Sequence, residues 1–206
     1  ELFKLAKRAD LQSLESLIAA AKQLPEDKYT SGSFASLQSA IQSAEAVAAD
    51  QNRGQDDIAN AYAQLVKAIK ALEMKGNKAA LQAVIQEAQE ILSDREAYVA
   101  STIEGLEDTL AQAKAVYDNE DAAQSQVNEA VQTLTLKITQ ARLIGDVNGD
   151  GKINTEDTTA VLRASAEIVV FSDYEAGSAD VNGDGKVNTD DAALILQYAA
   201  EKLAKF

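Results

Sequence analysis

Histidine and cysteine are both absent from the 206 residues of this sequence. The absence of histidine excludes catalytic triads that need an imidazole base, and it removes the commonest zinc ligand. The absence of cysteine excludes disulfide bonds and thiol chemistry, and it leaves secretion neither required nor excluded. The sequence also has no GxSxG motif and no glycine loop of the kind that binds phosphate. We therefore expect this chain not to be an enzyme.

Long apolar runs and positive charge are also scarce. No run approaches the roughly 20 apolar residues that a membrane-spanning helix needs. The chain has 19 Lys and Arg against 33 Asp and Glu, a net charge of −14. This excess opposes binding to nucleic acid and to anionic membranes, so neither is an expected partner.

The length suits two or three small domains. Because the chain opens within a helical pattern, we expect it to be the C-terminal part of a longer protein.

A motif of twelve residues rich in aspartate and asparagine occurs at 146–157 and again thirty-four places later at 180–191. The copies read DVNGDGKINTED and DVNGDGKVNTDD. Oxygen-bearing side chains alternate around a turn at Gly151 or Gly185, where a residue without Cβ can take a positive φ. Calcium takes roughly six to eight oxygen ligands. The two copies therefore predict two bound Ca²⁺ ions.

The predicted ligands follow the order of the EF-hand loop. Lys152 and Lys186 stand where that loop uses a backbone carbonyl, and Asn154 can act directly or through a water. Both loops end in aspartate where the EF-hand has a longer, bidentate glutamate, so the following helix must lie nearer the ion or the site must change shape. The full set is Asp146, Asn148, Asp150, Lys152, Asn154 and Asp157 in the first loop, and Asp180, Asn182, Asp184, Lys186, Asn188 and Asp191 in the second.

A helical pattern follows each loop, at 155–169 and 189–203, with apolar residues spaced by three or four. Acidic residues in the first turns also favour the helix dipole. The segment before each loop is not the long amphipathic helix that a full EF-hand has. Before the second loop, Ser172 can cap only a short helix. Each copy is therefore predicted to be a calcium loop that runs into a helix.

Residues 145–206 resemble a dockerin domain, through the GDVNGDGKIN motif, the aspartate that ends each loop and the near-symmetry of the two copies. Dockerins bind cohesin modules and so attach secreted glycoside hydrolases and related proteins to a scaffold protein or to another enzyme. In that family the contact is made mainly by the two repeated helices. The resemblance implies partner-binding residues Thr155, Glu156, Leu162, Arg163 and Glu167 in the first copy, and Thr189, Asp190, Leu196, Gln197 and Glu201 in the second.

The two implied surfaces are nearly identical, which would allow binding in two orientations related by a half-turn. Core packing is the alternative role for Leu162 and Leu196, and a solvated helix face is the alternative for Arg163 and Glu167. Calcium is expected to act mainly through folding, because a module of about sixty residues buries little core. We expect the calcium-free module to be largely unfolded and unable to bind cohesin.

Residues 1–144 contain a second internal repeat whose pattern is helical throughout. Each half has three segments with apolar residues spaced by three or four, which is one face of a helix. Leu37 aligns with Leu106, an offset of 69 (106 − 37). The first helix is predicted to end at Leu24, because the residue before a proline avoids the α region. Ser31 or Ser33 is expected to cap the second helix.

The expected fold is therefore all-α, with two tandem three-helix bundles at 1–75 and 76–144 and a small calcium-binding domain at 145–206. The seventy-residue bundles resemble the FIVAR module, through the helix pattern and the tyrosine before the second helix (Tyr29 and Tyr98). Such modules occur beside dockerins and in surface adhesins, as spacers or as binders of carbohydrate. Exposed tyrosines at Tyr62, Tyr98 or Tyr117 would favour glycan contact. Leu143 and Ile144 are expected to pack against the calcium-binding domain.

We thus interpret the chain as a non-catalytic, calcium-dependent attachment segment of an extracellular or cell-surface bacterial protein. Its dockerin would join a carbohydrate-active, cellulosome-like complex, with the bundles as spacers and a carbohydrate-active enzyme, such as a glycoside hydrolase, upstream. The alternative is an adhesin or carbohydrate-binding fragment in which the bundles carry recognition.

Overall fold

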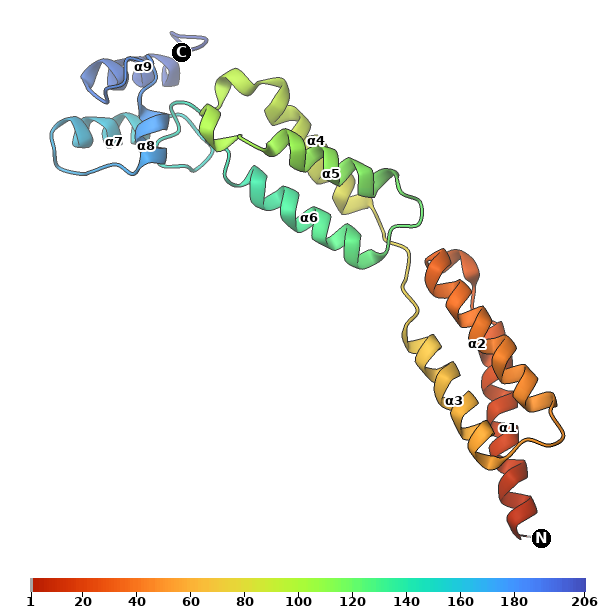
Figure 1. Ribbon diagram of the computed structural model, residues 1–206. Helices are drawn as coiled ribbons and strands as arrows, with labels where there is room; N and C mark the ends of the chain where they lie inside the picture. The colour runs from red at the N-terminus through yellow and green to blue at the C-terminus, as the bar shows by residue number, and fades with distance from the viewer. Residues whose placement is uncertain (1) are drawn as a thin grey trace. The chain divides into compact units, whose positions relative to one another are not determined.

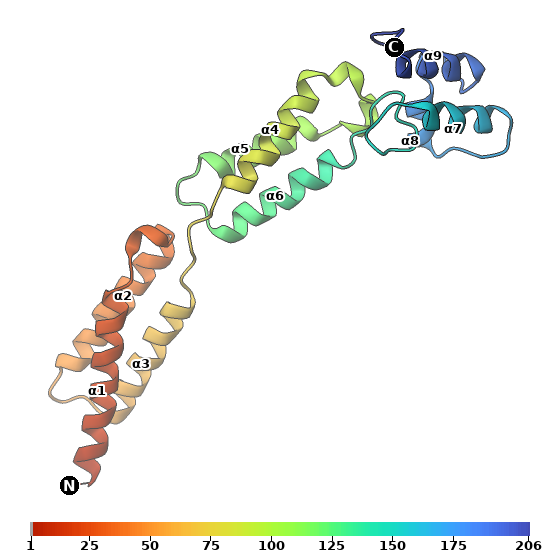
Figure 2. The same ribbon diagram turned by 180° about the vertical axis from the view of Figure 1, so that it is seen from behind.

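The computed structural model describes residues 2–206 of the chain, and it describes side chains from residue 11 onward. The predicted start of the first bundle at residue 1 lies outside the described residues. The described part is helical with only isolated β-bridges, so the predicted all-α fold is confirmed (Figures 1 and 2). None of its helices is both long and apolar enough to cross a membrane. The α-helices are α1 (Leu2–Lys22), α2 (Ser31–Ala49), α3 (Gln55–Lys70), α4 (Ala79–Ser93), α5 (Leu106–Asp118), α6 (Gln124–Ile138), α7 (Thr155–Ser165), α8 (Asp173–Ala179) and α9 (Thr189–Ala199).

The chain divides into two compact units. The first unit holds Glu1–Lys78 and Val116–Glu129, and it therefore contains α1 to α3, the end of α5 and the start of α6. The second unit holds Ala79–Ala115 and Ala130–Phe206, and it contains α4, most of α5 and α6, and α7 to α9. The predicted domain boundaries after residues 75 and 144 stay a prediction.

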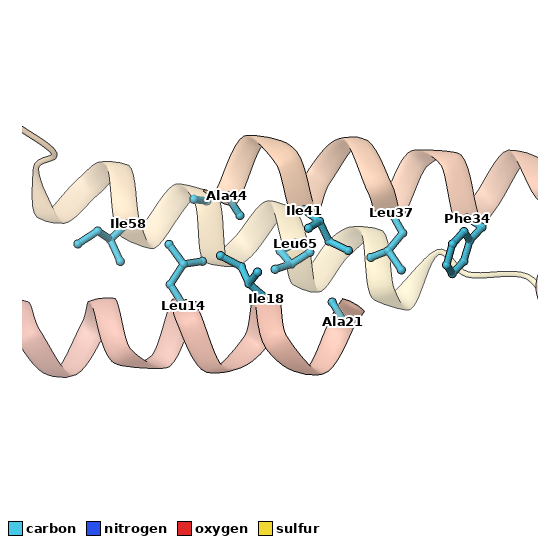
Figure 3. Packing of buried hydrophobic residues seen from close by; sticks show 10 residues of the cluster. Leu14, Ile18, Ala21, Phe34, Leu37, Ile41, Ala44, Ile58 and Leu65 are labelled. Atoms are coloured by element: carbon cyan, nitrogen blue, oxygen red, sulfur yellow. The ribbon is translucent and has the colours of Figure 1, made fainter. Parts of the chain in front are cut away.

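In the first unit, α1, α2 and α3 pack against one another around a common core (Figure 3). The apolar stripes predicted from the sequence supply this core, and Leu17, Tyr29, Val47 and Ile69 are partly buried against it. α1 ends at Lys22, close to the proline that was predicted to stop it. The buried residues are Leu14, Ile18, Ala21, Phe34, Leu37, Ile41, Ala44, Ile58, Ala61 and Leu65.

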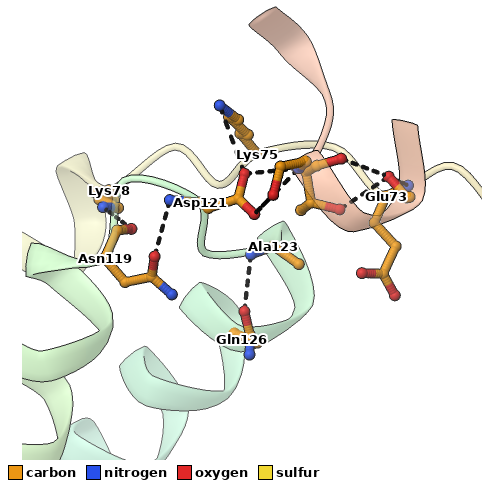
Figure 4. Close-up of polar contacts among 10 residues, drawn as sticks. Glu73, Lys75, Lys78, Asn119, Asp121, Ala123 and Gln126 are labelled. Carbon is orange, nitrogen blue, oxygen red and sulfur yellow. Dashed lines mark hydrogen bonds and ion pairs between the residues drawn. The ribbon is translucent and has the colours of Figure 1, made fainter. Parts of the chain in front are cut away.

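The start of α2 is held by a residue from much later in the chain. Thr30 is the N-cap, and its side chain makes no capping hydrogen bond, so the prediction that Ser31 or Ser33 caps this helix was wrong. The N–H of Ser31 donates to Asp121 Oδ1 at 2.8 Å, and the Ser31 hydroxyl donates to Asp121 Oδ2 at 2.7 Å. Lys75 Nζ lies 3.6 Å from the same carboxylate (Figure 4). A carboxylate ninety residues away thus satisfies a free N–H of the first helical turn, where negative charge is favourable.

The segment that leaves α3, residues 73–76, pairs on two sides within the first unit. One side faces residues 28–30, and the other faces residues 122–124, with bridges Tyr29↔Met74 and Lys75↔Ala123. Gly76 fits because a Cβ there would collide with the side chain of Val127. The backbone hydrogen bonds are Thr30 N to Glu73 O (2.8 Å), Lys75 N to Lys28 O (2.9 Å), Gly76 N to Ala122 O (2.8 Å) and Gln124 N to Met74 O (2.9 Å).

Asp121→Ala is expected to loosen the start of α2 without unfolding the first unit. The pKa of Asp121 is lowered, chiefly because the Ser31 hydroxyl and N–H donate to it, with a smaller contribution from the charge of Lys75. A lowered pKa means that the ionised carboxylate stabilises the fold above its unfolded pKa, and that this contribution is lost as the pH falls through the folded pKa. At neutral pH the variant should speed amide exchange at Ser31 by roughly two- to five-fold, as for an exposed ion contact.

The matched control is Asn52→Ala, because residue 52 occupies the equivalent turn of the first bundle (52 + 69 = 121) and makes no contact with Ser31 in the described structure. This control should leave exchange at Ser31 unchanged. An unchanged rate in Asp121→Ala as well would mean that the contact adds nothing to stability.

The two bundles differ at the start of their second helices. By the offset of 69, Ser31 at the start of α2 corresponds to Ala100, but α5 begins only at Leu106. A short 3-10 turn, Ala100–Thr102, and Gly105 with φ of 73° occupy the intervening residues. A left-handed residue cannot lie inside an α-helix, so Gly105 delays the helix by about a turn and a half. Ile103, which the offset of 69 aligns with Phe34 of α2 (103 − 69 = 34), therefore precedes α5.

In the second unit, the segment after α6 joins the bundle to the calcium-binding region. Residues 142–144 pair with residues 97–99 through a Tyr98↔Leu143 bridge and two backbone hydrogen bonds, Val99 N to Arg142 O (2.9 Å) and Ile144 N to Ala97 O (2.8 Å). Ile144 packs against the small core formed mainly by α7, α8 and α9, whereas Leu143 belongs to the bridge. That core consists of Val147, Val161, Ala179, Val181, Ala192 and Ile195.

Candidate metal centres and the repeated helix face

The first residue of the first loop, Asp146, organises the turn that follows it. It is 3% exposed, and both carboxylate oxygens accept backbone N–H groups. Oδ1 accepts from Gly149 (2.8 Å) and Asp150 (3.1 Å), and Oδ2 accepts from Gly151 (2.9 Å). The turn requires left-handed residues at Gly149 and Gly151, with φ of 73° and 82°, which explains the glycines there.

The last residue of the loop, Asp157, closes it and starts α7. It is fully buried. Its Oδ1 accepts from the N–H of Val147 (2.9 Å) and Asn148 (3.1 Å), at the beginning of the loop. Its Oδ2 accepts from the N–H of Asn154 (2.9 Å), which completes a capping box with the Asn154 side chain. One aspartate therefore joins both ends of the loop to the helix.

The second loop repeats this arrangement. Asp191 is fully buried, and its Oδ1 accepts from Val181 (3.1 Å) while its Oδ2 accepts from Asn188 (2.9 Å). Asp180 accepts from the N–H groups of Asp184 (3.1 Å) and Gly185 (2.8 Å). α7 and α9 pack against each other, so the two loop–helix units share one core.

The remaining predicted ligands lie within the same turns. Asn148 and Asn182 accept from the N–H two residues later, and Asp150 and Asp184 do the same for the lysine N–H. The side chains of Lys152 and Lys186 are exposed, which leaves their carbonyls as the predicted donors. Asn154 and Asn188 cap α7 and α9.

The donors of both loops are suited to a hard cation. All are carboxylate, amide or carbonyl oxygens, the ligand types that calcium prefers. Among the described residues no three acidic side chains gather into a carboxylate-only metal site, so a bound ion would depend on amide and carbonyl oxygens as well. Asp157 and Asp191 are buried, and neither forms an ion pair with a described residue. Buried charge without a partner is unfavourable, and a cation held in the loop would offset it.

The ten residues implied in partner binding all lie on the surface of α7 and α9 or directly after them. Each of them is exposed. Leu162 and Leu196 are 44% and 46% exposed, so neither belongs to the buried core. The two leucines occupy corresponding positions on α7 and α9, whose packing presents both copies within one small domain (Figures 1 and 2).

Both helices end at a glutamate in an unusual conformation. Glu167 and Glu201 have φ of 58° and 56°, in the left-handed region. Each ends its helix in a Schellman motif, with 2.9 Å bonds from Ile168 N to Arg163 O and from Lys202 N to Gln197 O. The helical patterns at 155–169 and 189–203 were therefore longer than the helices, which end at Ser165 and Ala199. Two implied contact residues thus lie just past the helix ends.

Aromatic side chains of the bundles offer little for glycan stacking. Tyr62 is 40% exposed beside a shallow hollow that glutamine, serine, leucine and alanine side chains of α1 line. Tyr98 is partly buried, and burial is the main reason that its pKa is raised, with smaller effects from nearby acids. Tyr117 is partly buried, with Lys78 Nζ 5.8 Å from the centre of its ring. Of these three candidates, Tyr62 is the most exposed.

Comparison with known families matches both parts of the chain. The family model for the FIVAR domain matches residues 10–73 and 77–142. The family model for the dockerin type I domain matches residues 144–198. These are the two families that the sequence patterns resemble, in the same order. No solved structure matches the chain.

Proposed function

Because the chain belongs to the FIVAR domain family over residues 10–142 and carries a dockerin type I domain at residues 144–198, we propose that it is a non-catalytic attachment segment. Its dockerin binds a cohesin module of a scaffold protein or another enzyme, and calcium is required. The FIVAR domains, at residues 1–75 and 76–144, space and orient the dockerin. The assembly is an extracellular, cellulosome-like complex at a bacterial cell surface, in which other domains carry the carbohydrate chemistry.

The repeated buried aspartate is the observation that carries this proposal. Asp157 and Asp191 each tie the two ends of an oxygen-rich loop to a helix start, and neither forms an ion pair with a described residue. We propose that each loop holds one Ca²⁺ through the six ligands predicted from its sequence, two ions in all. Bound calcium supplies the positive charge that the acidic loops lack. The loop residues in turn fix the first turns of α7 and α9.

The exposed face of α7 and α9 supports the partner assignment. The second copy repeats the first with two substitutions, Glu to Asp and Arg to Gln: Thr155, Glu156, Leu162, Arg163 and Glu167 recur as Thr189, Asp190, Leu196, Gln197 and Glu201. Exposed leucines flanked by polar residues are suited to the centre of a protein interface. Carbohydrate binding by the bundles is a second candidate, favoured only by the exposed Tyr62. Glycan-array binding by the whole chain that Tyr62→Ala abolishes would support it.

Calorimetric titration of the whole chain against a panel of cohesins tests the attachment function. Binding in calcium that disappears in excess chelator is the expected result. If no cohesin binds although both loops take up calcium, the partner is not one of the cohesins tested or the domain is not an attachment module, and the adhesin alternative gains weight.

Substitutions on the two helix faces will decide whether the dockerin binds in two orientations. With two equivalent modes, the pair Leu162→Ala and Arg163→Ala should weaken binding only about two-fold, since one mode of two is lost. The pair Leu196→Ala and Gln197→Ala should do the same, and the combined variant should lose at least about a hundred-fold.

A single mode would instead concentrate the whole loss in one of the two pairs. Asp173→Asn, at an exposed position in the first turn of α8 and outside the implied contacts, serves as the control and should leave the affinity unchanged.

A further inference from the structure

Arg142 connects the helical bundle to the first calcium loop. Its backbone belongs to the bundle side of the second unit. The Arg142 N–H donates to Thr102 Oγ1 at 3.1 Å, and its carbonyl accepts from Val99 N–H at 2.9 Å. These two hydrogen bonds fix the position from which the side chain extends.

The guanidinium group of Arg142 lies directly on the backbone of the first loop. A Cβ added at Gly149 would coincide with this group. Arg142 Nη1 is buried, and no hydrogen-bond partner for it exists among the residues that the structure describes. The pKa of Glu175 is lowered mainly by hydrogen bonds from Ser172, and the charge of Arg142 adds to this, which places the guanidinium near α8 as well. A positive charge with an unused donor therefore lies against the loop.

Among the residues that the structure describes, no side chain takes this place against Gly183 of the second loop. Gly183, the counterpart of Gly149, has φ of 71° against 73°, yet a Cβ added there would meet nothing within 4 Å. The residue thirty-four places after Arg142 is Ala176, which is neither long nor charged (142 + 34 = 176). The two loops thus have nearly the same sequence and closely similar φ angles at these glycines, but they differ in electrostatic surroundings.

We propose that Arg142 is a positioning residue that makes the two calcium loops unequal, by lowering the calcium affinity of the first loop and by coupling that loop to the bundle. This inference rests on the proposed calcium-dependent function. A fixed positive charge beside the loop repels an incoming divalent cation, and it already neutralises part of the acidic charge that would attract one. The Arg142 backbone is hydrogen-bonded to Val99 and Thr102. A movement of the guanidinium on calcium binding would therefore also displace these two residues of the bundle. Coupling of this kind is reciprocal.

The test is a calcium titration of the ¹⁵N-labelled whole chain by NMR, with the Gly151 amide reporting the first loop and the Gly185 amide the second. Arg142→Gln should tighten calcium binding at Gly151 by roughly three- to ten-fold and change it at Gly185 by less than about two-fold. Arg142→Lys keeps the charge and should stay near the unsubstituted chain. Equal changes at both loops, or none at Gly151, would overturn the inference.

A matched pair of glycine substitutions tests the contact itself. Gly149→Ala and Gly183→Ala introduce the same strain at a positive φ, but only the first displaces the Arg142 guanidinium. The Val99 amide should therefore shift in Gly149→Ala and not in Gly183→Ala. If it shifts in neither or in both, the coupling to the bundle is refuted.

The calcium titration separates a failure of the proposed function from a failure of the role assigned to Arg142. If neither Gly151 nor Gly185 responds to calcium in the unsubstituted chain, the calcium-dependent function is wrong and this inference falls with it. If both respond and Arg142→Gln alters neither, the function stands and only the role of Arg142 is wrong.

Discussion

Chelation of calcium is expected to remove most of the helix from residues 155–199 while α1, α2 and α3 remain folded. The domain that holds the two loops buries six apolar side chains in its core, too few for it to be stable alone. Each site at a thousand-fold excess of calcium over Kd contributes about 4 kcal/mol, so two sites contribute about 8 kcal/mol. A small domain has about 5–15 kcal/mol in total. Without the ions, mutual repulsion of the loop acids is added to that loss.

Far-UV circular dichroism during a chelator titration measures this loss of helix. NMR amides of Leu14 and Leu37, in the core of the first bundle, serve as an internal control that should not change. Restoring calcium should restore both the helix and cohesin binding. Helix content that chelator leaves intact would show that the calcium-binding domain folds without metal.

Asp157→Asn and Asp191→Asn are expected to be the most damaging single substitutions, each lowering the free energy of unfolding of the calcium-binding domain by about 3–5 kcal/mol. Each aspartate is fully buried, and its two oxygens accept N–H groups from both ends of its loop. An amide replaces one acceptor with a donor, which leaves at least one buried N–H facing an NH₂ group. The loss of a carboxylate also weakens the metal site.

Urea unfolding in saturating calcium, followed by the amides of α7 and α9, measures the effect. Asp173→Asn is the matched control, because Asp173 is an exposed acid in the first turn of α8, and it should change stability by less than about 0.5 kcal/mol. If the unfolding midpoint of Asp157→Asn equals that of Asp173→Asn, the buried carboxylate does not stabilise the calcium-binding domain.

The spacing of apolar residues by three or four predicted the helices of the first bundle, because the apolar stripe of each helix packs into one shared core. Leu14, Leu37 and Leu65, one from each of the first three segments, are all fully buried in the core of the first bundle. The short α8 was also predictable, since Ser172 caps it and Glu175 completes a capping box, a signal contained within four residues. Local patterns of this kind carry enough information to place an element and its buried face.

Contacts between distant residues were not predictable from the same patterns. Nothing in the sequence around Asp121 indicates that it meets Ser31, because a lone aspartate in a turn usually faces solvent. Arg142 also resembles an ordinary basic residue near a helix C-terminus, and its burial against Gly149 depends on how the chain turns after α6. Gly105 was a local signal that the repeat alignment obscured, because its counterpart in the first bundle, Ser36, continues the helix (105 − 69 = 36).

The paired segment at residues 73–76 has a mechanical consequence. Hydrogen bonds from Gly76 to Ala122 and from Gln124 to Met74 close a loop of chain that contains α4 and α5. Tension applied along the polypeptide would pass from residue 76 to residue 122 through these bonds before it reached the residues between them. In a chain pulled from its two ends, α4 and α5 would therefore be shielded from force until these hydrogen bonds, together with the Ser31–Asp121 contact beside them, had broken.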